Sequence, residues 1–336
     1  MPKPRVIVIG TGGTVSFAGV NSLDFFEYVD RGIRQEVAQV LERFPEVSDA
    51  ADVVAHDYRT ISSSGITTED WLALNALVHD IAAKSPTPDG IVITHGTATL
   101  EETAYFLHLT LKVPMPVVLV GAQRPSNTLA TDAGINLLNA VRVAACEASR
   151  GLGVLSILND EIQSGRDVTK TSTYRLQTFR SPDAGPLGVA DADGRVVYYR
   201  RPFRRHAPDT EFDVRGIAEL PRVDIAYAYA GADDAAIDAF LARGAKGIIS
   251  AGVAPGLPTP VQRDRLLAAA SAGISVVFSS RAQGGRVMSR QHMRDHGVVA
   301  ADNLNPQKAR VLTCVALGSY EAELSPLELQ RMFDTY

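Results

Sequence analysis

The sequence lacks a long hydrophobic run, has few cysteines and carries no strong charge of either sign. Its early apolar stretch, Val6–Ile9, is far shorter than a signal-peptide core or a membrane span. Two cysteines among 336 residues give no basis for a disulfide framework, and a net charge of −5 creates no positive field for a phosphate backbone. We therefore expect a soluble cytoplasmic protein that binds neither a membrane nor nucleic acid.

The composition is otherwise that of an ordinary globular protein, with 46% hydrophobic and 21% charged residues. A chain of this length exceeds the size at which one hydrophobic core usually keeps growing, so we expect two domains. Cys146 lies in a helix-like stretch and Cys314 in a strand-like run, Arg310–Leu317. We interpret both cysteines as small buried hydrophobic residues.

Short β-branched runs alternate with helical patterns along the first half of the chain. Helices are expected from about Thr68 and over Leu100–Leu109 and Asp132–Ala148. The strands expected between them are Arg5–Gly10, Ala51–Tyr58, Gly90–His95, Pro116–Gly121 and Gly153–Asn159. This alternation predicts a doubly wound, mainly parallel sheet, in which ligands bind at the carboxyl ends of the strands.

A segment rich in Gly, Pro and charge, residues 191–222, interrupts the pattern before a second series begins. In that series we expect strands at Asp224–Tyr229, Gly247–Val253, Ile274–Ser279 and Arg310–Leu317, with helices at Ala235–Ala242, Pro260–Ala272 and Pro326–Phe333. The predicted fold is thus two α/β domains: a larger one over residues 1–190, a linker over 191–222, and a smaller one over 223–336.

Glycine and threonine cluster directly after the first strand, in Gly10-Thr11-Gly12-Gly13-Thr14. Paired glycines allow a tight turn and can present backbone amides to a developing anion. The run contains neither GxGxxG nor GxxxxGK[ST], so both nucleotide-binding fingerprints are absent. A plain structural turn is the alternative interpretation.

Two later motifs also place polar side chains after strands. His95-Gly96-Thr97-Ala98-Thr99 leads into a helix, and helix capping accounts for only part of its hydroxyl content. Ser164–Thr171 places Lys170 among small polar residues. A lysine acts as a base only where its surroundings favour the neutral amine, and an ordinary solvated lysine is the alternative.

Taken together, these motifs resemble the bacterial-type asparaginases. TGGT, ITHGT-x-TLEET, GRDVTKT and LNPQKAR occur in the family's order, and the resemblance extends from about Val6 to Tyr336. It implies a large N-terminal and a smaller C-terminal α/β domain, a small-molecule amide as substrate, and no cofactor or metal. It also implies a homotetramer built as a dimer of dimers, with active sites at a dimer interface.

The resemblance further implies roles for individual residues in a two-step covalent hydrolysis. Thr14 matches the nucleophile, and Thr97 and Lys170 match a second catalytic pair. A tyrosine from the loop Val15–Asp30 closes over the nucleophile; Tyr28 is our candidate, with Phe25 and Phe26 as competitors in the alignment. Residues expected to bind the substrate or stabilise its oxyanion are Ser62, Ser63, Gly13, Gly96 and Ala98.

Ala98 departs from the family pattern, because the family has an aspartate there that pairs with the lysine and holds the substrate's α-ammonium group. Leu257 similarly stands where the family often has an asparagine, and Asp295 is the only acid in Gln283–Asp295. His292 and His296 have helical metal-ligand spacing but no third ligand besides Asp295, so we expect no metal. Three alternatives follow: a hydrolase of amides or imides without a free α-amine, a binding protein without turnover, or an engineered inactive variant.

Overall fold

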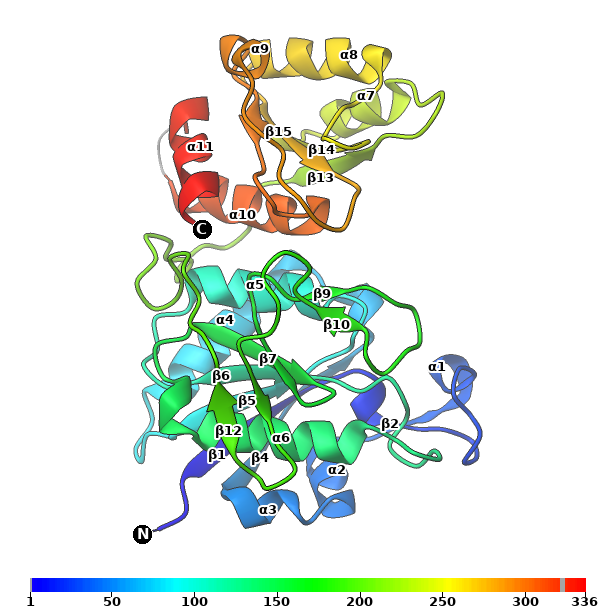
Figure 1. Cartoon of the computed structure of the whole chain (residues 1–336), viewed down its shortest axis with the longest axis vertical. Helices are drawn as coiled ribbons and strands as arrows, with labels where there is room; N and C mark the ends of the chain where they lie inside the picture. The colour runs from blue at the N-terminus through cyan, green and yellow to red at the C-terminus, as the bar shows by residue number, and fades with distance from the viewer. Residues whose placement is uncertain (1, 321–323) are drawn as a thin grey trace. The chain divides into compact units, whose positions relative to one another are not determined.

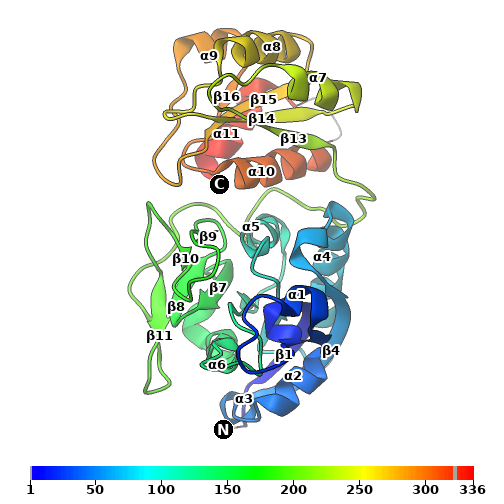
Figure 2. The same ribbon diagram turned by 90° about the vertical axis from the view of Figure 1, so that its right-hand side faces the viewer.

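The computed structural model describes residues 2–320 and 324–336. The chain folds into two compact units, residues 1–210 and 211–336. Part of the segment expected to be a linker therefore lies inside the first unit. Figure 1 and Figure 2 show the elements of each unit.

The first unit contains an eight-stranded sheet with the order β12-β11-β8-β7-β6-β5-β1-β4. The strands from β4 to β7 are parallel, whereas β8, β11 and β12 run antiparallel at the other edge. The strands are β1 (Arg5–Gly12), β4 (Asp52–Ile61), β5 (Gly90–Thr94), β6 (Val117–Val120), β7 (Val154–Leu158), β8 (Glu161–Ser164), β11 (Gly188–Ala190) and β12 (Val196–Tyr198). The apolar run Val6–Ile9 lies in β1, between two neighbours, and is buried on both faces.

Helices cover both faces of this sheet, as expected for a doubly wound fold (Figure 1). On one face α2 (Val37–Arg43), α3 (Val47–Ala50) and α6 (Ala133–Ala145) share a core with alternate residues of the central strands. The other face is covered by α4 (Thr68–Ala82) and α5 (Leu100–Thr110). The predicted doubly wound arrangement, a mainly parallel sheet with helices on both faces, is confirmed.

The second unit is a four-stranded parallel sheet with the order β13-β14-β15-β16. Its strands are β13 (Val223–Tyr227), β14 (Gly247–Gly252), β15 (Ser275–Ser280) and β16 (Val299–Ala300). Its helices are α7 (Ala235–Ala242), α8 (Pro260–Ser271), α9 (Gln291–Asp295), α10 (Pro306–Ser319) and α11 (Pro326–Thr335). In Figure 2, α10 and α11 lie on one side of the sheet and α7 and α8 on the other.

The prediction of a strand at Arg310–Leu317 is wrong, because this run lies within α10. An uninterrupted apolar run fits a fully buried helix as well as a buried strand. The signal that separates the two is upstream: the Asn305 side chain accepts a hydrogen bond from the Lys308 amide at 3.0 Å, and Pro306 occupies the first turn. Cys314 is therefore buried in a helix rather than in the sheet.

The segment 191–222 is partly structured. Val196–Tyr198 forms β12, which pairs with β11 and extends the large sheet by one strand. The two cysteines are free; Cys314 is buried as expected, whereas Cys146 is only half-buried. Among the described residues no helix combines the length and apolar character needed to cross a membrane.

Candidate active site

Three loops of the first unit meet at the carboxyl ends of β1, β4 and β5. Gly13 has a φ of 84°, and a Cβ atom placed on it would lie 2.4 Å from the Gly96 backbone. A Cβ on Gly96 would in turn lie 2.4 Å from the Ser63 side chain. Because both positions are glycine, the loops of Thr14, Thr97 and Ser63 can approach one another more closely than side chains would allow.

Thr14 lies in the short 3-10 helix η1 (Thr14–Ser16) and forms a hydrogen bond with Tyr28. The two oxygens are 2.8 Å apart, and Thr14 is only 9% exposed. Tyr28 opens α1 (Tyr28–Arg31), and its ring packs edge-on against Phe17. Burial raises the pKa of the Tyr28 phenol, so the group is protonated at neutral pH.

The other two aromatic candidates of the same loop lie elsewhere. Phe25 is stacked under the Arg124 guanidinium, and Phe26 is largely exposed. The hydrogen bond therefore singles out Tyr28 among the three residues between which the sequence left a choice. Tyr28 is positioned from its own backbone, since its amide donates to the buried Asp24 carboxylate at 3.0 Å.

Thr97 and Lys170 form the second pair of the site. The Lys170 ammonium nitrogen donates to Thr97 Oγ1 at 2.8 Å. Lys170 lies in β9 (Thr169–Lys170), which pairs with β10 (Phe179–Arg180) and orients the side chain. Burial lowers the pKa of Lys170, and the charge of Glu101 opposes that shift. The neutral amine is thus more accessible than on a solvated lysine.

The expected substrate-binding serines differ in what they contact. Ser63 Oγ accepts a hydrogen bond from the Ala98 amide at 3.3 Å, and the Ser63 carbonyl accepts one from Thr99 at 2.7 Å. The Ser62 hydroxyl is paired instead with Ser64, at 3.0 Å. Ala98 is exposed at the point where these loops meet, and its methyl group supplies no charge there.

Three residues near these groups were not singled out from the sequence. Glu101, four residues after Thr97, acts electrostatically on Lys170, and Tyr174 acts on Tyr28. His95 is fully buried, and burial lowers its pKa to about 4. Its Nδ1 lies 2.8 Å from the Gly96 carbonyl oxygen, so this nitrogen donates and fixes the turn. In the sequence, only the short separation of Glu101 from Thr97 could have been noticed.

Of the two positions at which the second unit departs from the family pattern, Asp295 accepts a hydrogen bond from Gln291 at 2.6 Å, and Leu257 forms a β-bridge with Val253. The His292 and His296 rings lie 4.5 Å apart, but within residues 2–320 and 324–336 no cluster of three potential metal ligands occurs.

Comparisons with known proteins cover nearly the whole chain. Residues 5–204 match the family model "Asparaginase, N-terminal", and residues 222–333 match "Glutaminase/Asparaginase C-terminal domain". The chain is 41% identical over 335 residues to L-asparaginase 2 of Escherichia coli, covering 99% of this chain and 93% of that protein. It is 40% identical over 335 residues to a glutaminase-asparaginase of Pseudomonas fluorescens, covering 99% and 90%.

A solved structure shares the same architecture. The crystal structure of a probable cytoplasmic L-asparaginase from Campylobacter jejuni has a TM-score of 0.93 at 37% identity, covering 99% of this chain and 100% of that one. Full-length identity, both family domains in order and the same fold agree with one another. The chain therefore belongs to the asparaginase family.

Proposed function

We propose that this protein hydrolyses the side-chain amide of L-asparagine to aspartate and ammonia through an acyl-enzyme on Thr14. Membership of the asparaginase family supports an amidohydrolase acting on linear amides. The observation that carries the assignment is the pairing of two threonine hydroxyls, each 2.8 Å from a group that can exchange a proton. Close contact of Gly13 with Gly96 brings the loops of the two pairs together.

In the first step Thr14 Oγ1 attacks the amide carbon. The Thr14 hydroxyl needs to lose its proton as it attacks, and Tyr28 is within hydrogen-bond reach. Because the raised pKa keeps the Tyr28 phenol protonated, it acts as a relay. It accepts the proton of Thr14 while giving its own to the amide nitrogen. Cleavage of the C–N bond then releases ammonia and leaves the acyl group on Thr14.

In the second step water attacks the acyl carbon. Neutral Lys170 takes a proton from this water through the Thr97 hydroxyl, to which it is hydrogen-bonded. Collapse of the tetrahedral intermediate breaks the ester bond, and the proton that Lys170 took from the water returns to the departing Thr14 oxygen, which restores the neutral amine and the Thr14 hydroxyl. Backbone amides of the Gly13 and Gly96 turns stabilise the negative oxygen in both steps, whereas the Ala98 amide donates to Ser63 Oγ. Ser63, with Ser62 beside it, binds the substrate's α-carboxylate.

Intact-mass spectrometry with a slowly hydrolysed substrate tests the nucleophile. We expect the wild-type protein to gain the mass of one acyl group, which peptide mapping places on Thr14. Thr14→Ala should show no adduct and lose about a thousandfold or more in kcat, as removal of a covalent nucleophile does elsewhere. Thr14→Ser should retain part of the activity, and Thr87→Ala, on an exposed loop, all of it. An adduct that persists in Thr14→Ala contradicts the proposal.

Ala98 favours a second candidate substrate, an amide that lacks a free α-amine. An α-ammonium group held where no anion compensates it would lose hydration without a partner. Succinamate is asparagine without that group, so ammonia release from the two compounds separates the candidates. A higher kcat/KM for asparagine supports the leading proposal, and a higher kcat/KM for succinamate supports the second.

We further propose a homotetramer in the cytoplasm. One relative is named a probable cytoplasmic enzyme, whereas another, from Haemophilus influenzae, is named a probable periplasmic one. Light scattering after size-exclusion chromatography measures the assembly, and fractionation of cells measures the location.

A further inference from the structure

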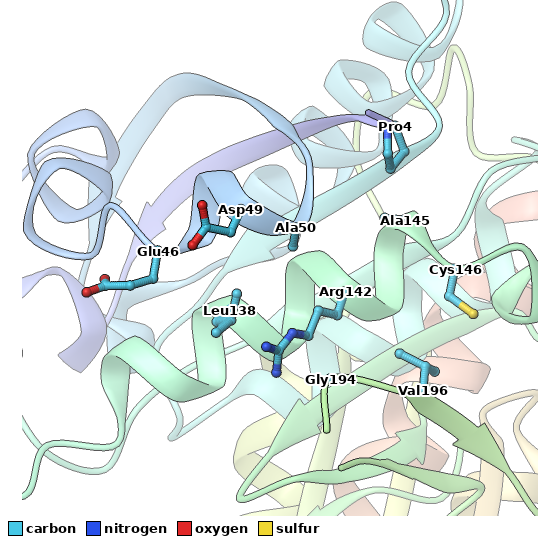
Figure 3. A pocket seen from close by; sticks show the side chains of 10 residues that line it. All are labelled: Pro4, Glu46, Asp49, Ala50, Leu138, Arg142, Ala145, Cys146, Gly194 and Val196. Atoms are coloured by element: carbon cyan, nitrogen blue, oxygen red, sulfur yellow. The ribbon is translucent and has the colours of Figure 1, made fainter. Parts of the chain in front are cut away.

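A hollow at the amino-terminal edge of the large sheet is separate from the candidate active site. Its cavity volume is about 630 Å³, within the range of small-molecule sites. Its lining includes Pro4, Glu46, Asp49, Arg142, Cys146 and Gly194 (Figure 3). Pro4 precedes β1, whereas Thr14 follows its carboxyl end, so the hollow and the candidate active site lie at opposite ends of the same strand.

The cation of this hollow, Arg142, is held in position by buried polar groups. Its Nη1 donates to Asn139 Oδ1 at 3.0 Å, and Asn139, which is 1% exposed, donates to Asp160 at 2.9 Å. No carboxylate of the described residues forms an ion pair with Arg142. A guanidinium group has five N–H donors in a planar fork that fits a carboxylate, and one of the two Nη groups is already engaged. The remaining donors suit one anion.

On one side Arg142 is flanked by the turn before β12. A Cβ atom placed on Gly194 would lie 3.5 Å from the guanidinium group, so this turn lies within van der Waals range of the arginine. Leu138, Ala145 and Val196 add apolar surface around it (Figure 3). The hydrogen bond to Asn139 and the apolar residues around it distinguish Arg142 from a flexible, solvated arginine on the surface.

Two carboxylates lie on the opposite wall. Glu46 directly precedes α3 and Asp49 lies within it, and both are exposed at the rim of the hollow (Figure 3). Neither forms an ion pair within residues 2–320 and 324–336. Their charges repel a dianion such as phosphate or a dicarboxylate and attract an ammonium group. The lining of the hollow thus carries one fixed cation and two carboxylates without ion pairs, a set of charges complementary to a zwitterion.

From these observations we propose that the hollow is a second ligand site, which binds a small zwitterion of the α-amino acid type. The ligand's carboxylate binds Arg142, and its ammonium group faces Glu46 and Asp49. The proposal does not depend on hydrolysis at Thr14, because the groups that carry it belong to α3, α6 and the turn before β12. Many free amino acids carry the same carboxylate and ammonium groups as the proposed ligand, so the test includes several of them.

The two cysteines provide a direct assay. Cys146 lines the hollow and is half-buried, whereas Cys314 is fully buried and burial raises its pKa to about 11. A maleimide at pH 7.5 therefore modifies Cys146 selectively, because the thiolate is the reactive form. The rate is measured on the full-length Thr14→Ala protein, so that added asparagine is not consumed. Aspartate, asparagine and glycine are compared with succinate and butylamine, which each lack one of the two charges.

We expect saturating amino acid to slow the modification of Cys146 at least about fivefold, because a bound ligand covers the thiol in proportion to its occupancy. Succinate and butylamine should change the rate little. Arg142→Gln should abolish the protection, and the exposed Arg201→Gln should preserve it. In the double variant Glu46→Gln, Asp49→Asn, succinate should become protective, which a structural role of these residues would not produce.

The opposite results are equally clear. Protection by succinate or butylamine as strong as that by aspartate would overturn the zwitterion assignment. An absence of protection by any amino acid at high concentration, or protection that survives Arg142→Gln, would show that the hollow is not a site. Since Thr14 is already replaced, failure of the hydrolase proposal leaves this result unchanged.

Discussion

The two threonines of the candidate site have the same functional group but different partners, and the roles that we propose for them rest on this difference. Thr14 contacts a phenol whose pKa is raised by burial, and Thr97 contacts a lysine whose pKa is lowered by burial. The phenol keeps its proton at neutral pH and can relay one, whereas the amine can lose its proton and accept one. This fits the proposed mechanism, in which Thr14 attacks beside a relay and Thr97 activates water beside a base.

Ala98 directly follows Thr97, the hydrogen-bond partner of Lys170, and carries no charge. We predict that Ala98→Asp shifts the acid limb of the pH–kcat profile to higher pH by about one unit, since an opposite charge nearby stabilises the ammonium form of lysine. A higher pKa of Lys170 means less neutral amine at any given pH, so activity is lost from the acid side. Steady-state ammonia release between about pH 5 and pH 10 measures the limb.

The matched control is Ala98→Asn, which adds a side chain of nearly the same size without charge. Its acid limb should stay where the wild-type limb lies. If the two variants shift the profile equally, the effect is steric, and the neutral amine of Lys170 is not the limiting species.

At the scale of elements, the site depends on loops that touch through their backbones. Gly13 at the end of β1 and Gly96 at the end of β5 are in contact, because their parallel parent strands are neighbours that end at the same edge. The sequence predicted strands, turns and edge correctly. It did not specify which atoms of the two turns meet, since that depends on the register of Gly10 with Thr94.

We predict that Gly13→Ala lowers kcat about a hundredfold, because displacement of a catalytic group by about 1 Å has costs of that order. The added methyl group would overlap the Gly96 backbone, and the left-handed φ of 84° adds about 1–2 kcal/mol of strain. Gly151→Ala is the control, because Gly151 also has a positive φ, of 68°, but an added methyl group there would meet nothing within 4 Å.

Gly151→Ala should lose only the stability that its positive φ costs and should keep its activity, whereas Gly13→Ala should lose more stability in thermal unfolding and most of its activity. Equal kcat values in the two variants would show that the contact between the loops does not position Thr14.

At the scale of the whole molecule, each unit has its own hydrophobic core. The first contains the only tryptophan, Trp71, which is stacked on Phe106 and donates to Thr103 at 2.9 Å. The second includes the chain's last residue, Tyr336, which is fully buried against Phe212. Fluorescence of Trp71 therefore reports on the first unit alone.

We predict that Tyr336→Ala destabilises the second unit by about 3–5 kcal/mol, the usual cost of removing a buried aromatic ring. Urea unfolding followed by far-UV circular dichroism should show an earlier transition, while the transition seen by Trp71 fluorescence should not move. Leu327→Ala, at a position 81% exposed on α11, should leave both signals unchanged. A shift of the Trp71 transition equal to that of the dichroism would mean that the two units unfold together.

The sequence by itself determined the class of the fold and most of its elements. Strand and helix periods are local properties, and the run Val6–Ile9 predicts a strand buried on both faces wherever it lies. Arg310–Leu317 was assigned wrongly, because an apolar run without alternation fits a buried helix and a buried strand equally. The cap at Asn305 and Pro306 in the first turn separate these two interpretations.

Tertiary structure decided what depends on contacts between distant residues. Tyr28 was distinguished from Phe25 and Phe26 by its hydrogen bond to Thr14, and the altered pKa of Lys170 follows from its burial. The hollow at Arg142 combines α6 with α3 and with the turn before β12, which are far from α6 in the sequence. Burial, distance and charge complementarity arise only after the chain has folded, because they are properties of pairs of residues and not of either residue alone.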